Sequence, residues 1–358
     1  MKCYGVIMAG GGGTRFWPLS RQRRPKQLIN LTGNDLLINE TIDRVSRLVG
    51  LDDIFVVTNR DQAQKTLLAT NGRILHNHIL VEPCARNTCA CIGYAAMEIL
   101  QKYGDGLMLI LPADAYIKDV NTYVAKLRIA VEYVENHDKL VTLGVQPYFP
   151  ATGYGYIRFD GYSDSSVKSV LEFKEKPDAA TAARYISTGE YLWNCGIFVW
   201  RASTVLQKIR DFAPDIADQL DILGAAMGTD KEEVVKEEIY PQLRKISIDY
   251  AVVEPSAANG DVSVVPGAFG WSDVGSWDML HTINETDSDN NVLFGDVLPL
   301  DTENSVVYAK NKLIATLGIK DLVIVETDDA ILVCAKDQAQ NVKSIVDSLE
   351  GIGRKEFL

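Results

Sequence analysis

Short apolar runs alternate with amphipathic segments along the first half of the chain. Tyr4 to Ala9 has the length of a buried strand, and similar runs recur at 54–58, 107–111 and 140–145. Between these runs the sequence has helical periodicity, as where Ile38, Ile42 and Val45 fall on one face. Helices are therefore predicted at 36–49, 61–69, 87–100 and 122–135. This alternation favours an α/β fold with a mostly parallel sheet covered on both faces, whose ligands bind beyond the carboxyl ends of the strands.

The pattern changes after about residue 150 and again after about residue 285. Strands are predicted near 152–157, 167–173 and 193–198, followed by helices at 202–228 and 231–240 and a strand at 262–265. Short strands then recur at 305–309, 312–316, 322–325 and 331–334. A closing helix is predicted, with Asp337 and Gln340 as its capping box and an apolar stripe of Val342, Ile345, Val346 and Leu349. We expect one domain over residues 1–284 and a smaller one over 285–358.

Composition limits the classes of function. The chain has 358 residues, of which 47% are apolar, so it can bury a large core. Its formal net charge of −12 argues against general binding to nucleic acid or to a membrane surface. No apolar segment approaches the roughly 20 residues of a membrane helix, and glycines interrupt the first apolar run too early for a signal peptide. Six scattered cysteines without a CxxC pair, and four histidines without zinc-site spacing, indicate reduced thiols in a cytoplasmic protein.

A glycine-rich loop with a basic segment behind it stands out from this acidic background. Four glycines, Gly10 to Gly13, follow the first apolar run, and backbone amides of such a loop can form a concave anion site. Five cations follow within a dozen residues: Arg15, Arg21, Arg23, Arg24 and Lys26. The loop lacks the Gly-Lys-Ser/Thr ending of a P-loop and the acidic partner of a dinucleotide fold. A polyanion site is one interpretation, and a glycine-rich hairpin followed by a solvated basic loop is the other.

The run AGGGGTRFWPLS at 9–20, followed by Pro25, Lys26 and Gln27, resembles the sugar-phosphate nucleotidylyltransferases, and the mannose-1-phosphate guanylyltransferases in particular. The resemblance implies a Rossmann-like, GT-A-like nucleotidyltransferase fold. It implies that the loop residues Gly10, Gly11, Gly13 and Thr14 wrap the nucleotide phosphates. It also implies that Arg15 and Lys26 bind the pyrophosphate leaving group.

The segment from Glu82 to Thr88 has two interpretations. As a local structure it is a loop that caps a helix, in which Asn87 or Thr88 accepts hydrogen bonds from free backbone amides. The family has a similar Glu-Pro…Arg-Asn-Thr segment against the guanine base. The resemblance therefore implies that Glu82, Asn87 and Thr88 contact the base, where a carboxylate suits the donors on guanine.

Three motifs in the middle of the chain, TGYGYI, FKEKP and WNCGIF, occur in the family in this order and form its sugar-phosphate pocket. Taken alone, Glu175 and Lys176 are a solvated pair at a strand end and Asn194 is a turn residue. The resemblance implies that Gly155, Glu175, Asn194 and Asp249 serve the sugar, while Lys176 holds its phosphate and acts in catalysis. For Asp249 a structural role stays open.

Two aspartates match the metal ligands of the family. Asp114 follows the apolar run 107–111, at a strand end that faces the ligand crevice. Asp273 lies in the loop GWSDVGSW and, without the resemblance, would be read as a turn residue. Together they imply a Mg²⁺ site that also uses phosphate oxygens. The family usually reads LPADH where this chain has Ala115, so a neighbouring histidine is missing.

The resemblance covers essentially the whole chain and implies the reaction of GTP with mannose 1-phosphate to give GDP-mannose and pyrophosphate. It implies a short left-handed β-helix at the C-terminal end that packs on the catalytic domain or across a dimer, so we expect a homodimer. Two alternatives stay open. One is the same reaction with another sugar phosphate or nucleotide, and the other is a regulatory homologue without activity.

Overall fold

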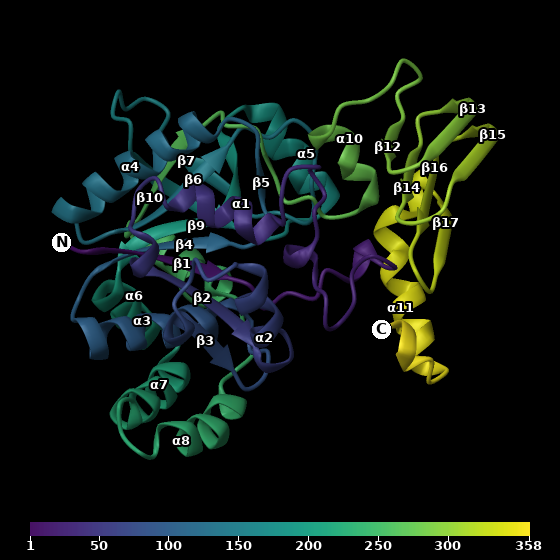
Figure 1. The fold of residues 1–358 in the computed structure, drawn as a ribbon. Helices are drawn as coiled ribbons and strands as arrows, with labels where there is room; N and C mark the ends of the chain where they lie inside the picture. Colours follow the sequence, from purple (N-terminus) through teal and green to yellow (C-terminus); the bar gives the residue numbers. More distant parts are fainter.

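The computed structural model describes all residues from 1 to 358. Its centre is a nine-stranded sheet with the order β3-β2-β1-β4-β9-β6-β10-β8-β7 (Figure 1). The strands are β1 (Cys3–Met8), β2 (Ile54–Asn59), β3 (Ile79–Glu82), β4 (Leu107–Pro112), β6 (Leu140–Val145), β7 (Tyr156–Phe159), β8 (Lys168–Lys174), β9 (Tyr191–Arg201) and β10 (Val262–Gly267). A separate antiparallel ribbon joins β5 (Tyr116–Ile117) to β11 (Trp271–Ser272). This ribbon places the segment after β11 beside the segment after β4.

The sheet is mixed, so the expectation of a mostly parallel sheet is only partly correct. Strands β3, β2, β1 and β4 are parallel, as are β6 and β10. Strand β9 runs antiparallel to β4, β6 and β7, and β8 runs antiparallel to β7 and β10. A short loop joins β7 to β8, and parallel neighbours need a crossover of a dozen or more residues. The segment between β6 and α6 therefore adds the antiparallel strands.

Helices cover both faces of the sheet, as predicted. They are α1 (Leu37–Val45), α2 (Arg60–Ala69), α3 (Asn87–Tyr103), α4 (Val120–Asn136), α5 (Ala179–Thr188), α6 (Ala202–Phe212), α7 (Pro214–Ala226), α8 (Glu232–Ile239), α9 (Glu254–Ala258), α10 (Leu280–Ile283) and α11 (Lys343–Gly351). Alternate residues of β1 enter two different cores: Val6 packs with α3 and α6, and Ile7 packs with α1 and α4. The single helix expected at 202–228 is two helices, because Pro214 cannot continue α6 and instead begins α7. None of the helices is long and apolar enough to cross a membrane.

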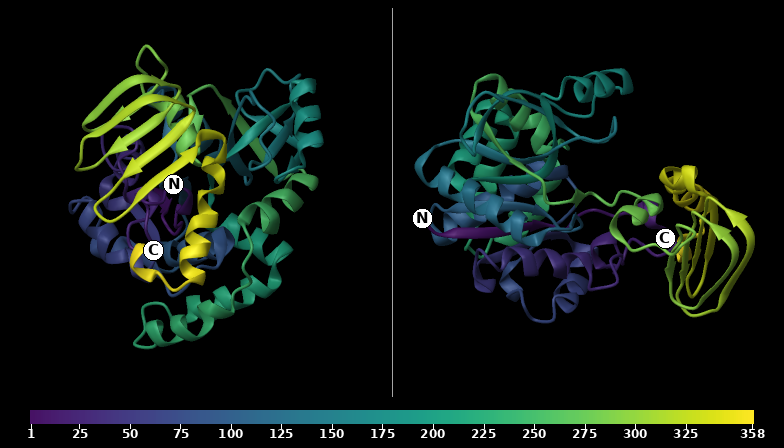
Figure 2. Two further views of the ribbon diagram at one scale, coloured as in Figure 1. Left: turned by 90° about the vertical axis from the view of Figure 1, so that its right-hand side faces the viewer. Right: turned by 90° about the horizontal axis from the view of Figure 1, so that it is seen from above.

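The C-terminal part is a small coil of short strands at one end of the molecule (Figure 2). Its strands are β12 (Val292–Phe294), β13 (Val297–Glu303), β14 (Val306–Ala309), β15 (Ile314–Lys320), β16 (Leu322–Glu326) and β17 (Ile331–Ala335). Parallel pairs connect β12 to β14, β14 to β16 and β13 to β15, so successive turns of the chain stack on one another. The sequence pattern did not predict β12 and β13, whose side chains are mostly half-buried or exposed.

The closing helix differs from its prediction at its start. Residues Lys336–Val342 form a 3-10 helix without a side-chain cap, and α11 begins only at Lys343. The capping box of Asp337 and Gln340 is therefore wrong, and Gln340 bonds elsewhere. The predicted apolar stripe is correct, because Val342, Ile345, Val346 and Leu349 all pack against one core.

Candidate active site

The glycine-rich loop leaves β1 and turns back at Gly13. Gly13 has a φ of 61°, and a Cβ atom there would lie 2.3 Å from the Cβ atom of Lys26. Glycine is therefore needed both for the backbone conformation and for the close approach of Lys26. The Ser20 hydroxyl donates to the Gly13 carbonyl at 2.8 Å, which fixes the turn. The loop thus brings the lysine of the basic segment to the carboxyl end of β1.

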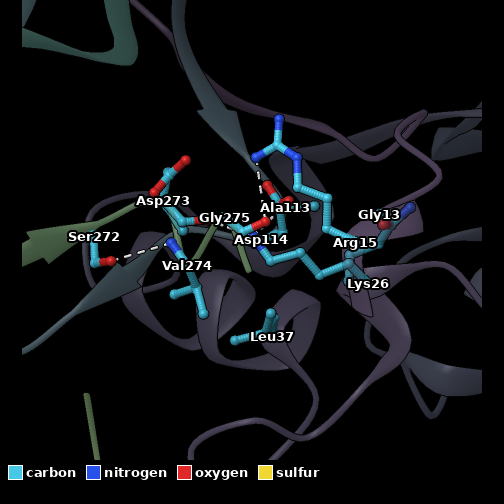
Figure 3. A network of polar contacts seen from close by, with 12 residues as sticks. Gly13, Arg15, Lys26, Leu37, Ala113, Asp114, Ser272, Asp273, Val274 and Gly275 are labelled. Carbon is cyan, nitrogen blue, oxygen red and sulfur yellow. Dashed lines mark hydrogen bonds and ion pairs between the residues drawn. The ribbon is translucent and has the colours of Figure 1, made fainter. Parts of the chain in front are cut away.

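Lys26 connects the two aspartates expected at the metal site (Figure 3). Although only 5% exposed, its ammonium lies 3.0 Å from the Asp114 carboxylate and donates to the Asp273 backbone carbonyl. The Arg15 guanidinium donates to the Gly275 carbonyl at 3.3 Å. These residues line one polar cavity of about 280 Å³, together with Gly13 and Thr14. Three segments far apart in the sequence therefore converge, from the glycine loop, the end of β4 and the loop after β11.

The other cations of the basic segment do not line this cavity. Arg21 forms an ion pair with Asp329 of the C-terminal part at 2.7 Å. Arg23 and Arg24 are exposed on the surface. Of the five cations, Arg15 and Lys26 therefore line the cavity, and the interpretation as a polyanion site stays a prediction for these two.

Tyr154 fixes the carboxylate of Asp273 in the site. Its hydroxyl donates to Asp273 Oδ1 at 2.6 Å, and its ring packs edge-on against Trp271. Burial and the nearby charge of Asp273 raise the pKa of Tyr154 far above its usual value, so the phenol keeps its proton and remains a donor. Both aspartates also line a second cavity of about 160 Å³, with Ala115, Trp271 and Asp249 in its wall. The sequence did not assign a role to Tyr154, although its motif TGYGYI was noted.

The residues expected around the sugar lie together at the next part of the sheet. A Cβ atom at Gly155 would lie 2.5 Å from Glu175 Oε2 and 3.2 Å from the Cβ atom of Asn194, so glycine is required there. The Asn194 amide donates to Asp249 at 2.9 Å, and its oxygen accepts from the Thr142 hydroxyl. Thr142 was not predicted from the sequence, since a threonine in a buried strand carries no local signal of function.

The carboxylates of this cluster are only partly paired with positive charge. Glu175 is 6% exposed; one of its oxygens accepts from the Lys176 ammonium, and the other, Oε2, is buried without a partner. Burial and the charge of Glu175 raise the pKa of Asp249 to about 6. Burial alone would lower the pKa of Lys176, but its hydrogen bond to Glu175 and the nearby carboxylates raise it, so the lysine stays charged. The cluster therefore holds a cation paired with Glu175 beside a second Glu175 oxygen that can accept a hydrogen bond.

The three residues expected to contact the base differ in their burial and in their hydrogen-bond partners. Glu82 ends β3 and is 4% exposed; one of its oxygens accepts from Tyr240, and burial raises its pKa. Its other oxygen faces Gly10, where a Cβ atom would approach within 3.2 Å. Thr88 lines the cavity of about 160 Å³ and accepts from the Ile248 amide, whereas Asn87 caps the next residue with its own side chain. The capping interpretation is only partly correct, because Asn87 accepts from the Thr88 amide but α3 has no side-chain N-cap. Tyr240 is a partner that no local pattern predicted.

Comparison with known proteins assigns this architecture to a class. The family model described as nucleotidyl transferase matches residues 4–290, and the model described as MannoseP isomerase/GMP-like beta-helix domain matches residues 295–349. The chain belongs to the nucleotidyl transferase family. Its fold is accordingly a mixed α/β nucleotidyltransferase fold with a C-terminal β-helix domain.

Individual relatives narrow the class further. The chain is 40% identical to mannose-1-phosphate guanylyltransferase of Escherichia coli, over 99% of this chain and 75% of the relative. It is 38% identical to the alginate biosynthesis protein AlgA of Pseudomonas aeruginosa, over 98% and 73%. A crystal structure from Thermus thermophilus, described as mannose-1-phosphate geranyltransferase, is 37% identical with a TM-score of 0.88 and covers 98% of this chain and 100% of that one. These findings confirm the family resemblance of the glycine-rich motif.

Proposed function

We infer that this chain is a mannose-1-phosphate guanylyltransferase, which makes GDP-mannose and pyrophosphate from GTP and mannose 1-phosphate. Similarity to such enzymes along the whole chain supports this function. The observation that carries it is the convergence of Arg15, Lys26, Asp114 and Asp273 on one cavity. In this reaction a phosphate oxygen of mannose 1-phosphate forms a bond to the α-phosphorus of GTP. The bond from that phosphorus to the oxygen bridging to the β-phosphate breaks, and pyrophosphate leaves with the electron pair.

The protein has to position two phosphates and neutralise their charge, because the sugar phosphate is already a nucleophile. We assign contacts with the nucleotide phosphates to the loop residues Gly10, Gly11, Gly13 and Thr14. Arg15 and Lys26 line the same cavity and would stabilise charge on the departing pyrophosphate. Lys176 would hold the attacking phosphate, since its positive charge lies beside the sugar cluster.

A magnesium ion fits the donor set of this site. Asp114 and Asp273 line a common cavity, and no group of three or more His, Cys, Asp or Glu side chains is arranged to hold a metal by itself. Magnesium is commonly bound by one or two carboxylates together with substrate phosphates, so two aspartates are enough when GTP is present. When bound between Asp114 and Asp273, the ion would neutralise phosphate charge and make the α-phosphorus more electrophilic.

We assign separate sets of residues to the sugar and to the base, and Asp249 of the first set and Thr88 of the second line the same cavity. For the sugar we propose Gly155, Glu175, Asn194 and Asp249; the buried, unpaired Oε2 of Glu175 suits a donating hydroxyl. For guanine we propose Glu82, Asn87 and Thr88. Asn87 has the weakest support of these, because its side chain is exposed and already caps Thr88.

The experiment that tests this function is a pyrophosphate-release assay with four nucleoside triphosphates and a panel of sugar 1-phosphates. We expect the highest kcat/KM for GTP with mannose 1-phosphate. Preference for another pair would keep the reaction class and change the substrate. No activity with any pair would favour the regulatory homologue, although all the proposed charged residues are present in this chain.

We further propose a division into residues 1–284 and 285–358, with a left-handed coil in the second part, and a homodimer formed through that coil. Leu300 and Leu317 are register partners on β13 and β15, and they are 51% and 70% exposed. Ile331 and Val333 on β17 are also more than half exposed. Apolar side chains gathered on one small domain suit burial against a second copy. Leu300→Glu combined with Leu317→Glu should give a monomer in light scattering, and an unchanged mass would place the interface elsewhere.

A further inference from the structure

The loop after β11 holds its catalytic position through an unusual backbone. Val274 has a φ of 44° and is fully buried, a conformation that is rare for a β-branched residue and carries strain. Its two neighbours are the residues whose carbonyls meet the site, Asp273 bound by Lys26 and Gly275 bound by Arg15. In Figure 3 the Val274 side chain and Leu37 lie on one side of the loop and the Asp273 carboxylate on the other. Strain of this kind persists only where the surroundings fix the loop.

Part of those surroundings comes from the C-terminal part. One hydrophobic core combines Phe16 of the glycine-rich segment, Val274 and Trp277 of the loop, and Val323 and Val342 of the C-terminal part. Figure 1 shows the same arrangement, with the N-terminal purple segment reaching the yellow helix α11. The last residues also take part, since the Trp17 indole donates to the Phe357 carbonyl at 2.9 Å. The C-terminal part is thus packed directly against the loops that carry Arg15 and Asp273.

One hydrogen bond joins the C-terminal part to the loop after β11, between the side chains of Gln340 and Ser276. Ser276 is fully buried, and its hydroxyl accepts from the Gln340 amide at 2.6 Å while it donates to Asp278. Because the hydroxyl donates its only proton to Asp278, its hydrogen-bonding partner on the other side has to be a donor. Gln340 also lines a cavity of about 460 Å³ that shares Arg15 and Asp273 with the active site. No other polar side chain of the 3-10 helix Lys336–Val342 bonds to this loop.

We propose that Gln340 is a positioning residue for the reaction. Its amide holds Ser276, so that the strained loop keeps the Gly275 carbonyl on Arg15 and the Asp273 carboxylate at the phosphates. Gln340 makes no hydrogen bond to Arg15, Lys26 or either aspartate, so it acts through the loop. The proposal rests on the proposed function for its assay, and it adds that the C-terminal part takes part in arranging the active site.

The test compares three variants of the full-length protein. Gln340→Met keeps the length of the side chain and removes the donor, and Gln340→Lys keeps a donor at the end of a chain of similar length. Gln338→Met is the matched control, because Gln338 is exposed on the same 3-10 helix and bonds only to Asn341. For each variant kcat, KM for mannose 1-phosphate, the Kd for pyrophosphate and Tm are measured.

Gln340→Met should lower kcat about tenfold, the effect of one hydrogen bond of typical strength, and weaken pyrophosphate binding severalfold. KM for mannose 1-phosphate should stay close to wild type, because the sugar cluster lies elsewhere. Tm should fall by only a few degrees, because the buried Ser276 hydroxyl loses its donor while the exposed Gln340 side chain contributes little else. Gln340→Lys should restore most of the rate, and Gln338→Met should match wild type. Wild-type kcat in Gln340→Met, or equal losses in the Met and Lys variants, would overturn the proposal. A wild-type protein without activity would instead refute the proposed function.

Discussion

Replacing Lys26 by methionine removes one charge from the centre of the site and keeps most of the side-chain volume. The ammonium is 3.0 Å from Asp114, a distance at which the attraction is on the order of 5 kcal/mol at an effective dielectric constant of about 20. The Asp114 side chain is 40% exposed, so water offsets most of this attraction and the net value is about 1 kcal/mol. The charged hydrogen bond to the Asp273 carbonyl adds about 1.5–3 kcal/mol. We therefore expect Lys26→Met to fold, with a Tm lowered by several degrees.

The effect on turnover should be much larger than the effect on stability. A preorganised charge contact at the site of developing charge contributes about a hundredfold to a thousandfold in kcat. We therefore expect Lys26→Met to lose at least a hundredfold in kcat, measured by pyrophosphate release well below its Tm. Arg23→Met is the matched control, because Arg23 belongs to the same basic segment and is exposed. A kcat of Lys26→Met within about threefold of wild type would refute the assignment of Lys26 to the leaving group.

Three further predictions concern the other parts of the site. Asp114→Asn and Asp273→Asn should each abolish most turnover without unfolding the protein. Turnover of each variant is measured as a function of magnesium concentration at saturating GTP. Normal magnesium dependence in either variant would exclude that aspartate as a ligand. Glu82→Gln keeps an acceptor for Tyr240 and should lower the preference for GTP over ATP, measured as a kcat/KM ratio; an unchanged ratio would place base recognition elsewhere. Because the folded-state pKa of Asp249, about 6, lies above its ordinary 3.8, its ionisation destabilises the folded state as pH rises through that range. The Tm of Asp249→Asn relative to wild type should therefore be higher at about pH 8 than at about pH 4, and a constant difference would contradict the shift.

The parts of the fold that the sequence predicted are those with a local signal. Strands such as β1 and β4 are apolar runs of strand length, and the helices between them carry an apolar stripe, so both are visible in short windows. The antiparallel course of β9 is different, because direction depends on which strands lie beside it, and β9 lies between β4 and β6. A run such as WNCGIF is equally apolar in either direction. For this reason a mixed sheet was predicted as a mostly parallel one.

The residues of the candidate site also divide into those with a local sequence signal and those without one. Motif positions indicated Arg15, Lys26, Asp114 and Asp273, because their neighbours in the sequence are distinctive, and the structure brings all four to one cavity. The contacts that support these four residues join segments far apart in the sequence, so no local sequence motif predicts them.

Gln340 illustrates why those supporting contacts escape a reading of the sequence. Its spacing from Asp337 matches a capping box, and a capping glutamine has to bond to the backbone of its own turn. Here the amide bonds to Ser276, 64 residues away, because the 3-10 helix lies against the loop after β11. Ser276 needs a donor because its own proton goes to Asp278, two residues further along the same loop. The capping rule considers only acceptors in the same turn of the chain. In the folded protein the Gln340 amide instead donates to the Ser276 hydroxyl, which is buried and would otherwise lack a donor. This hydrogen bond connects the C-terminal part to the active-site loop.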